Sequence, residues 1–70
     1  MLAEAEILER LQELGLRVTQ PRRLIVRSVL SQNGPFSAEE LLSQLHQSTS
    51  APGRATVFRT LDLLVEIGVL

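Results

Sequence analysis

Residues 52–70 read PGRATVFRTLDLLVEIGVL, a turn signal followed by a polar, cationic segment and then a leucine-rich one. The apolar spacing predicts a helix over residues 54–67. When successive residues are placed 100° apart, one apolar set falls within about 100° of arc, which is the width of a buried stripe. That predicted stripe consists of Val57, Leu61, Leu64 and Val65.

The opposite side of this predicted helix carries Ala55, Thr56 and Arg59, with Phe58 at the margin. In a helix-turn-helix, the second helix lies in the major groove and contacts base edges with its N-terminal residues. Its remaining half must be apolar to hold the domain together. The helix begins at Arg54, where free backbone N–H groups and the positive end of the helix dipole suit a phosphate. The segment therefore predicts a DNA-recognition helix.

Three more helices are predicted upstream, over residues 3–14, 20–33 and 38–48, because apolar residues recur there with helical spacing. The second is the most apolar and is expected to be central. Local start and stop signals support these bounds. The signals are Thr19 as an N-cap, the capping box Ser37–Glu40, and the terminators Gly15, Asn33-Gly34-Pro35, Ser48–Gly53 and Gly68. The apolar faces are Ile7, Leu8, Leu11 and Leu14; Leu24, Ile25, Val26, Val29 and Leu30; and Ala38, Leu41, Leu42 and Leu45.

Four helices with short connections predict an all-α domain of the helix-turn-helix type, residues 38–48 and 54–67 forming the pair. The break between these two is longer than the tightest such turns, which favours the winged variety. Val69-Leu70 is interpreted as the start of a strand. Leu63 and Ile67 form a second apolar ridge, expected to pack on the first helix or on a wing.

Composition limits the classes of function. The chain has 70 residues, no cysteine and a net charge of −1, and all seven of its cations are arginines. The low net charge argues against a nucleic-acid partner, but residues 14–36 carry four arginines and no acid. Arginine suits phosphate and guanine contacts, although arginine-rich usage is equally typical of a GC-rich genome. No nucleophile–base pair or glycine-rich phosphate loop indicates an enzyme.

The segments GLRVTQPRRLIVRSVL, FSAEELLSQL and ATVFRTLDLLVEIGVL resemble the landmarks of the N-terminal domain of the ferric uptake regulator (Fur) family. They occur in the family's order and spacing, from about Leu14 to Leu70. ATVFRTL is the most specific, because the family's signature there is Ala-Thr-Val-Tyr-Arg-Thr/Val-Leu. The resemblance implies a winged-helix domain that binds operator DNA, within a dimeric, metal-sensing transcription regulator.

Carried over by position, Arg59 matches the signature arginine that contacts DNA. Phe58 matches the signature tyrosine, whose ring packs on thymine methyls, so only the hydroxyl is lost. Arg17 matches a basic position near the minor groove, and Arg22 the arginine of the family's Pro/Gln-Arg pair. Gly53 stands where the family usually has a serine N-cap. The predicted DNA-binding set is Arg17, Arg22, Arg54, Ala55, Thr56, Phe58 and Arg59.

Several of these residues have a second interpretation. Arg54 and Thr56 are also compatible with solvated positions in the first turn, and Phe58 with core packing. Arg23 and Arg27 form a like-charge pair that either a phosphate or the glutamates of the first helix would relieve. The single histidine, His46, is interpreted as a solvated helix-end residue, and Phe36 as a core residue.

The family's metal chemistry is not expected in this stretch. Many iron-sensing members have a histidine ligand at the position of Pro35, which cannot bind metal, and this favours a zinc-sensing or divergent member. We expect the chain to be part of a longer cytoplasmic protein that binds zinc, iron or manganese and forms a homodimer. Its partner is then double-stranded operator DNA rather than a membrane, and its role repression of metal-homeostasis genes. The alternative is a winged-helix protein-interaction module with little DNA affinity.

Overall fold

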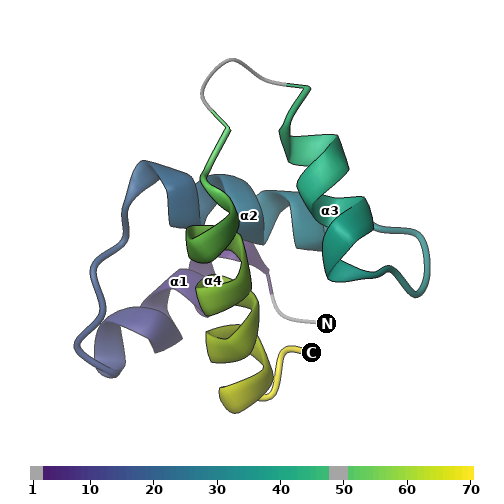
Figure 1. Cartoon of the computed structure of the whole chain (residues 1–70). Coiled ribbons are helices and arrows are strands. Elements are labelled where there is room, and N and C mark those ends of the chain that lie inside the picture. The colour runs from purple at the N-terminus through teal and green to yellow at the C-terminus, as the bar shows by residue number, and fades with distance from the viewer. Residues whose placement is uncertain (1–2, 48–50) are drawn as a thin grey trace.

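The computed structural model describes residues 3–47 and 51–70. Within them lie four helices and no strand: α1 (Glu4–Glu13), α2 (Gln20–Leu30), α3 (Ala38–Leu45) and α4 (Arg54–Glu66). The central helix α2 contacts each of the other three, and α3 and α4 pack against each other (Figure 1). The all-helical prediction, the central place of the second helix and the α3–α4 pair are confirmed. The wing remains a prediction.

The helix starts follow the local signals. Thr19 Oγ1 accepts a hydrogen bond from the backbone N–H of Arg22 at 3.4 Å, which caps α2. At the start of α3, Ser37 Oγ accepts from the Glu40 N–H at 3.1 Å and Glu40 Oε1 accepts from the Ser37 N–H at 3.0 Å. This reciprocal pair is the predicted capping box, and it satisfies two donors that a helix start leaves open.

Helices α1 and α4 end in the same way. Gly15 and Gly68 take positive φ angles of 82° and 84°, which cost other residues more because of their Cβ atom. In each case the glycine N–H donates to the carbonyl three residues back, and the next N–H donates to the carbonyl five residues back, at 2.9–3.1 Å. This Schellman arrangement satisfies two of the last helical carbonyls.

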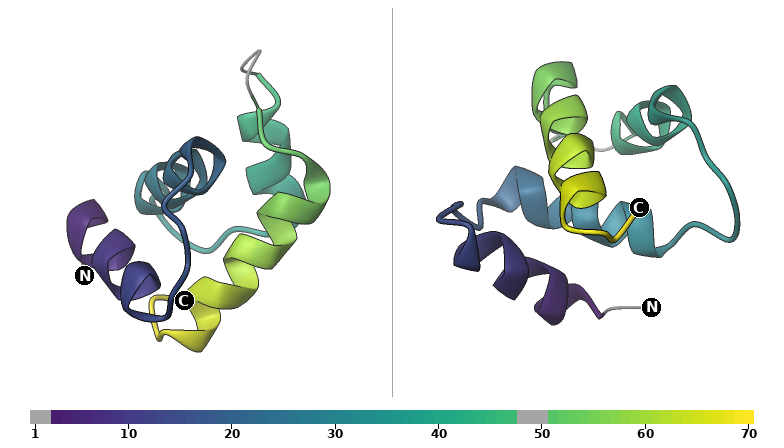
Figure 2. Two further views of the ribbon diagram at one scale, coloured as in Figure 1. Left: turned by 90° about the vertical axis from the view of Figure 1, so that its left-hand side faces the viewer. Right: turned by 90° about the horizontal axis from the view of Figure 1, so that it is seen from below.

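The cap of α4 also explains why Val69-Leu70, expected to start a strand, lie in no strand in this structure. The N–H groups of Val69 and Leu70 donate to the carbonyl of Leu64, at 2.9 and 3.3 Å. The main chain is thus folded back on the helix end, and no described residue offers a neighbouring strand. Figure 2 shows this last segment turning back beside α4.

Helices α1 and α4 match their predicted bounds to within one residue at each end, whereas α2 and α3 end earlier than predicted. Helix α2 ends at Leu30 rather than at residue 33. The Ser31 hydroxyl and the side-chain amide of Gln32 both donate to the backbone carbonyl of Ser28, at 2.8 and 2.9 Å, in place of a further helical N–H. Helix α3 ends at Leu45 with His46 as its C-cap. The predicted end at Ser48 lies outside the described residues.

All four helices contribute to one apolar core, as their predicted faces require. Two predicted members, Leu14 and Val65, are exposed, at 53% and 59%. Four more are only half-buried: Leu24, Leu30, Ala38 and Leu61. Leu14 follows the last residue of α1, so the helical spacing no longer places it. Val65 is mostly exposed although it was predicted to be inside, whereas Thr60, which was not, is 1% exposed. The buried apolar residues are Ile7, Leu8, Leu11, Ile25, Val26, Val29, Leu41, Leu42, Leu45, Val57 and Leu64.

Candidate nucleic-acid interface

The outer face of α4 presents most of the predicted DNA-contacting side chains. Arg54, Ala55 and Arg59 are exposed and Phe58 is half-buried, while Val57 on the same two turns is fully buried. The outer face of the first two turns is therefore cationic, with one aromatic ring. It is held against the rest of the domain by the buried side of the same helix.

Thr56 lies at the edge of this surface rather than at its centre. It is half-buried, because the core face of α4 is turned toward Thr60 and away from Val65. The predicted placement of Thr56 opposite the core is wrong to that extent.

The start of α4 has no side-chain cap. Gly53 is the N-cap, with φ −68° and ψ 160°, and offers no side-chain oxygen. The predicted use of glycine as the cap is confirmed. The N–H groups of a first helical turn have no partners within the helix, so this end of α4 suits an anion.

Arg54 is engaged by α3. Its guanidinium donates to both carboxylate oxygens of Glu39, with Nη1 to Oε2 at 3.2 Å and a second bond from Nη2 to Oε1. The same guanidinium lies over the ring of Phe58, 5.0 Å from its centroid. The hydrogen bond from Arg54 lowers the pKa of Glu39 below its ordinary value of 4.5, and the pair raises the pKa of Arg54.

Arg59 is the most available cation of α4. It is exposed, and its side chain forms no hydrogen bond or ion pair with any residue that the structure describes. Asp62 and Glu66 follow on the exposed side of α4. Positive charge is therefore confined to the first two turns of the helix.

Arg17 and Arg22 form a second basic group at the entry to α2. Arg22 Nη1 donates to the backbone carbonyl of Arg17 at 2.9 Å, which ties the loop to the first turn of the helix. Arg17 is exposed and Arg22 half-buried. No hydrogen bond or ion pair joins this group to the side chains of α4 in the described ranges.

Two further ionisable residues singled out by the sequence, Arg27 and His46, lie outside the candidate interface. Arg27 donates to Glu4 of α1, so the intramolecular relief of the Arg23–Arg27 repulsion is confirmed for Arg27. His46 is exposed at the C-cap of α3, as predicted. Among residues 3–47 and 51–70, no three His, Cys, Asp or Glu side chains gather as a metal site would require.

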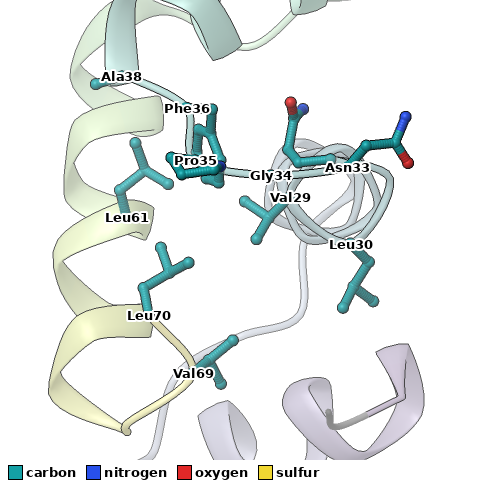
Figure 3. A pocket seen from close by; sticks show the side chains of 11 residues that line it. Val29, Leu30, Asn33, Gly34, Pro35, Phe36, Ala38, Leu61, Val69 and Leu70 are labelled. Atoms are coloured by element: carbon teal, nitrogen blue, oxygen red, sulfur yellow. The ribbon is translucent and has the colours of Figure 1, made fainter.

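A cavity of about 620 Å³ lies on another side of the domain, between the end of α2, the following loop and α4 (Figure 3). Phe36, Leu61 and Leu70 line it, and none of its lining residues is ionisable. None of the predicted DNA-contacting residues lines it either. The cavity therefore offers neither catalytic groups nor a part of the cationic surface.

The sequence analysis did not predict the burial of Thr60 or the pairing of Glu39 with Arg54. Thr60 stands three residues after Val57 and four before Leu64, so its burial could have been found from helical spacing. Glu39 could not, because its partner Arg54 is 15 residues away across the break between α3 and α4. Nothing local to the sequence signals that contact.

None of the described helices has both the length and the apolar character needed to cross a membrane. Comparison with known proteins gives a consistent picture. The model of the ferric uptake regulator family matches residues 13–70. A ferric uptake regulation protein from Haemophilus ducreyi is 36% identical over 63 residues, covering 86% of this chain and 42% of that protein. The chain thus spans about two-fifths of the length of this relative. No solved structure matches this chain.

Proposed function

The chain belongs to the ferric uptake regulator family, whose members are metal-responsive transcription regulators, and we propose that it is the DNA-binding domain of such a regulator. In this proposal α4 enters the major groove of operator DNA. One observation carries the proposal: α4 is anchored by the buried residues Val57, Thr60 and Leu64, while Arg59 is exposed and forms no hydrogen bond or ion pair with the described residues.

Each outward residue then has a role. Arg59 contacts a guanine edge or a phosphate, and Phe58 packs on thymine methyls. Ala55 allows the helix to approach closely, and Thr56 faces the backbone of the groove. Their positions on the first two turns of α4 support this assignment, because the N-terminal residues of a recognition helix reach the base edges.

A second set of contacts fixes the domain on the duplex. Arg17 and Arg22 would bind the sugar-phosphate backbone beside the entry to α2. Arg22 uses one Nη1 bond for the carbonyl of Arg17, and a guanidinium has five N–H donors, so others remain for a phosphate. Such contacts set position and add affinity without reading sequence.

Metal and dimerisation belong to the intact protein in this proposal. Pro35 occupies the position of the family's histidine ligand, and the described residues form no metal cluster. We therefore assign the zinc, iron or manganese ligands and the dimer interface to residues outside this chain, which covers 42% of its relative. A wing is expected to complete the domain, and a cytoplasmic homodimer would repress metal-homeostasis genes from an inverted repeat.

The test is a titration of the intact protein into DNA from its own promoter, first with EDTA and then with Fe²⁺, Mn²⁺ or Zn²⁺. We expect metal-dependent, sequence-specific binding. Arg59→Ala should weaken it by about 1–3 kcal/mol, the contribution of one good bidentate base contact. Arg10→Ala is the matched control, because Arg10 is an exposed arginine of α1 beside the opposite end of α4.

The protein-interaction module remains the competing function. It predicts binding no tighter than to random DNA under every metal, and equal behaviour of Arg59→Ala, Arg10→Ala and the unmodified protein. Low net charge favours it, but the family assignment does not.

A further inference from the structure

The first turns of α3 and α4 are joined by one charged contact. Glu39 is the second residue of α3 and Arg54 the first residue of α4. Both carboxylate oxygens accept from the guanidinium, and both side chains are about 60% exposed, at 61% and 60%. The planar fork of arginine matches a carboxylate in this bidentate geometry, which fixes the orientation of the guanidinium as well as its position.

This orientation places the guanidinium against a residue of the candidate interface. The guanidinium lies 5.0 Å from the centroid of Phe58, one turn further along α4. A cation over an aromatic face within about 6 Å is attracted by the ring. Glu39, Arg54 and Phe58 therefore form a continuous chain of contacts from α3 to the outer face of the recognition helix.

We propose that Glu39 is a positioning residue for DNA binding: its carboxylate holds Arg54 on the ring of Phe58 and so keeps this guanidinium off the phosphate backbone. The inference rests on the function proposed above. It also changes the place of Arg54 in the predicted DNA-binding set, because Arg54 becomes a support for Phe58 instead of a residue that contacts DNA itself.

The physical reason is the chemistry of an unpaired arginine at a helix start. The positive end of the helix dipole repels it, and an anion is its natural partner. DNA offers that anion at every nucleotide, so a free Arg54 would add affinity equally on all sequences. Glu39 supplies the anion within the domain. Binding to random DNA is lowered, and the discrimination exerted by Phe58 and Arg59 is kept.

The salt dependence of binding measures this directly, because each phosphate contact adds about 0.9 to the slope of log K against log salt concentration. The intact protein is titrated into promoter DNA and random DNA at several salt concentrations. The variants are Glu39→Gln, Arg54→Ala and the two combined. Glu40→Gln is the matched control, because it removes the same charge one residue away and glutamine still completes the capping box.

We expect Glu39→Gln to steepen the slope by about 0.9 for each chain bound, an extra loss of roughly threefold in affinity between about 50 and 200 mM salt. Its binding to random DNA at low salt should rise. Arg54→Ala and the combined variant should keep the slope of the unmodified protein, as should Glu40→Gln. A slope that falls by about 0.9 in Arg54→Ala and stays constant in Glu39→Gln would overturn the proposal. So would equal slopes in all variants.

A second readout needs no DNA. Nuclear magnetic resonance should show the carboxyl pKa of Glu39 rising in Arg54→Ala, and the Phe58 ring signals shifting in Glu39→Gln but not in Glu40→Gln. If these changes are absent while the protein binds its promoter, the positioning role fails and the proposed function stands. If they are present but the unmodified protein binds no DNA specifically, it is the proposed function that fails.

Discussion

The two faces of α4 differ in almost every physical property. The inner face, Val57, Thr60 and Leu64, is at most 1% exposed and carries no charge. The outer face carries Arg54 and Arg59, and the one ion pair that it forms in the described structure, Arg54 with Glu39, is exposed to solvent. This separation by face continues to the end of the helix, since Val65 is 59% exposed in the apolar half. The inner face therefore holds the fold together, while the outer face is free to change without unfolding the domain.

Leu64→Ala should produce the largest effect on stability. Leu64 is fully buried between α4 and the helices it packs on, and removing such a side chain costs about 2–5 kcal/mol of unfolding free energy. That is a large part of the stability of a 70-residue domain. Urea denaturation followed by circular dichroism measures it.

The neighbouring Val65→Ala is the control for this prediction. Because Val65 is mostly exposed, its truncation should change the unfolding free energy by no more than about 0.5 kcal/mol. Comparable losses in the two variants would show that the faces of α4 are not divided as described.

Thr60→Val tests the one polar side chain of the inner face. Thr60 Oγ1 is buried and has no hydrogen-bond partner in the described structure, and an unsatisfied buried group costs about 1–3 kcal/mol. Valine has the same shape without the hydroxyl, so we expect a gain of up to about 1 kcal/mol. Thr56→Val, at the half-buried edge, is the comparison. A clear loss in Thr60→Val would mean that the hydroxyl has a partner.

The smallest effect is expected on the outer face and depends on pH. Arg54 lowers the pKa of Glu39 below 4.5 in the folded state, so their pair contributes its full stabilisation above pH 4.5. That contribution is lost as the pH falls through the lowered pKa. The difference in melting temperature between the unmodified protein and Glu39→Gln should therefore be small at neutral pH and shrink in acid. A difference that grows in acid would contradict the assignment.

Much of the helical framework followed from signals that act within a few residues. Thr19 and the Ser37–Glu40 capping box were placed correctly because a cap needs only the next turn of the helix. Gly15 and Gly68 were correctly predicted as helix terminators for the same reason. The helix bounds themselves were less secure, as the early end of α2 at Leu30 shows.

The candidate site was only partly accessible in this way. Arg59 and Phe58 were found because a family signature surrounds them, and their roles on DNA stay predictions. The choice between DNA and solvent for Arg54 was left open by the sequence, and a protein partner was not among the alternatives. Its partner Glu39 lies on another helix, so only the packing of α3 against α4 brings the two together.

The sequence by itself determined four helices, most of their caps, the apolar faces and membership of a family. These depend on interactions within one or two turns, or on residue identity alone. Tertiary structure decided that Val65 is outside and Thr60 inside, that Arg27 pairs with Glu4, and that Arg54 lies between Glu39 and Phe58. Each of these depends on the direction from which neighbouring helices approach, and helical spacing fixes which residues share a face but not which face is covered.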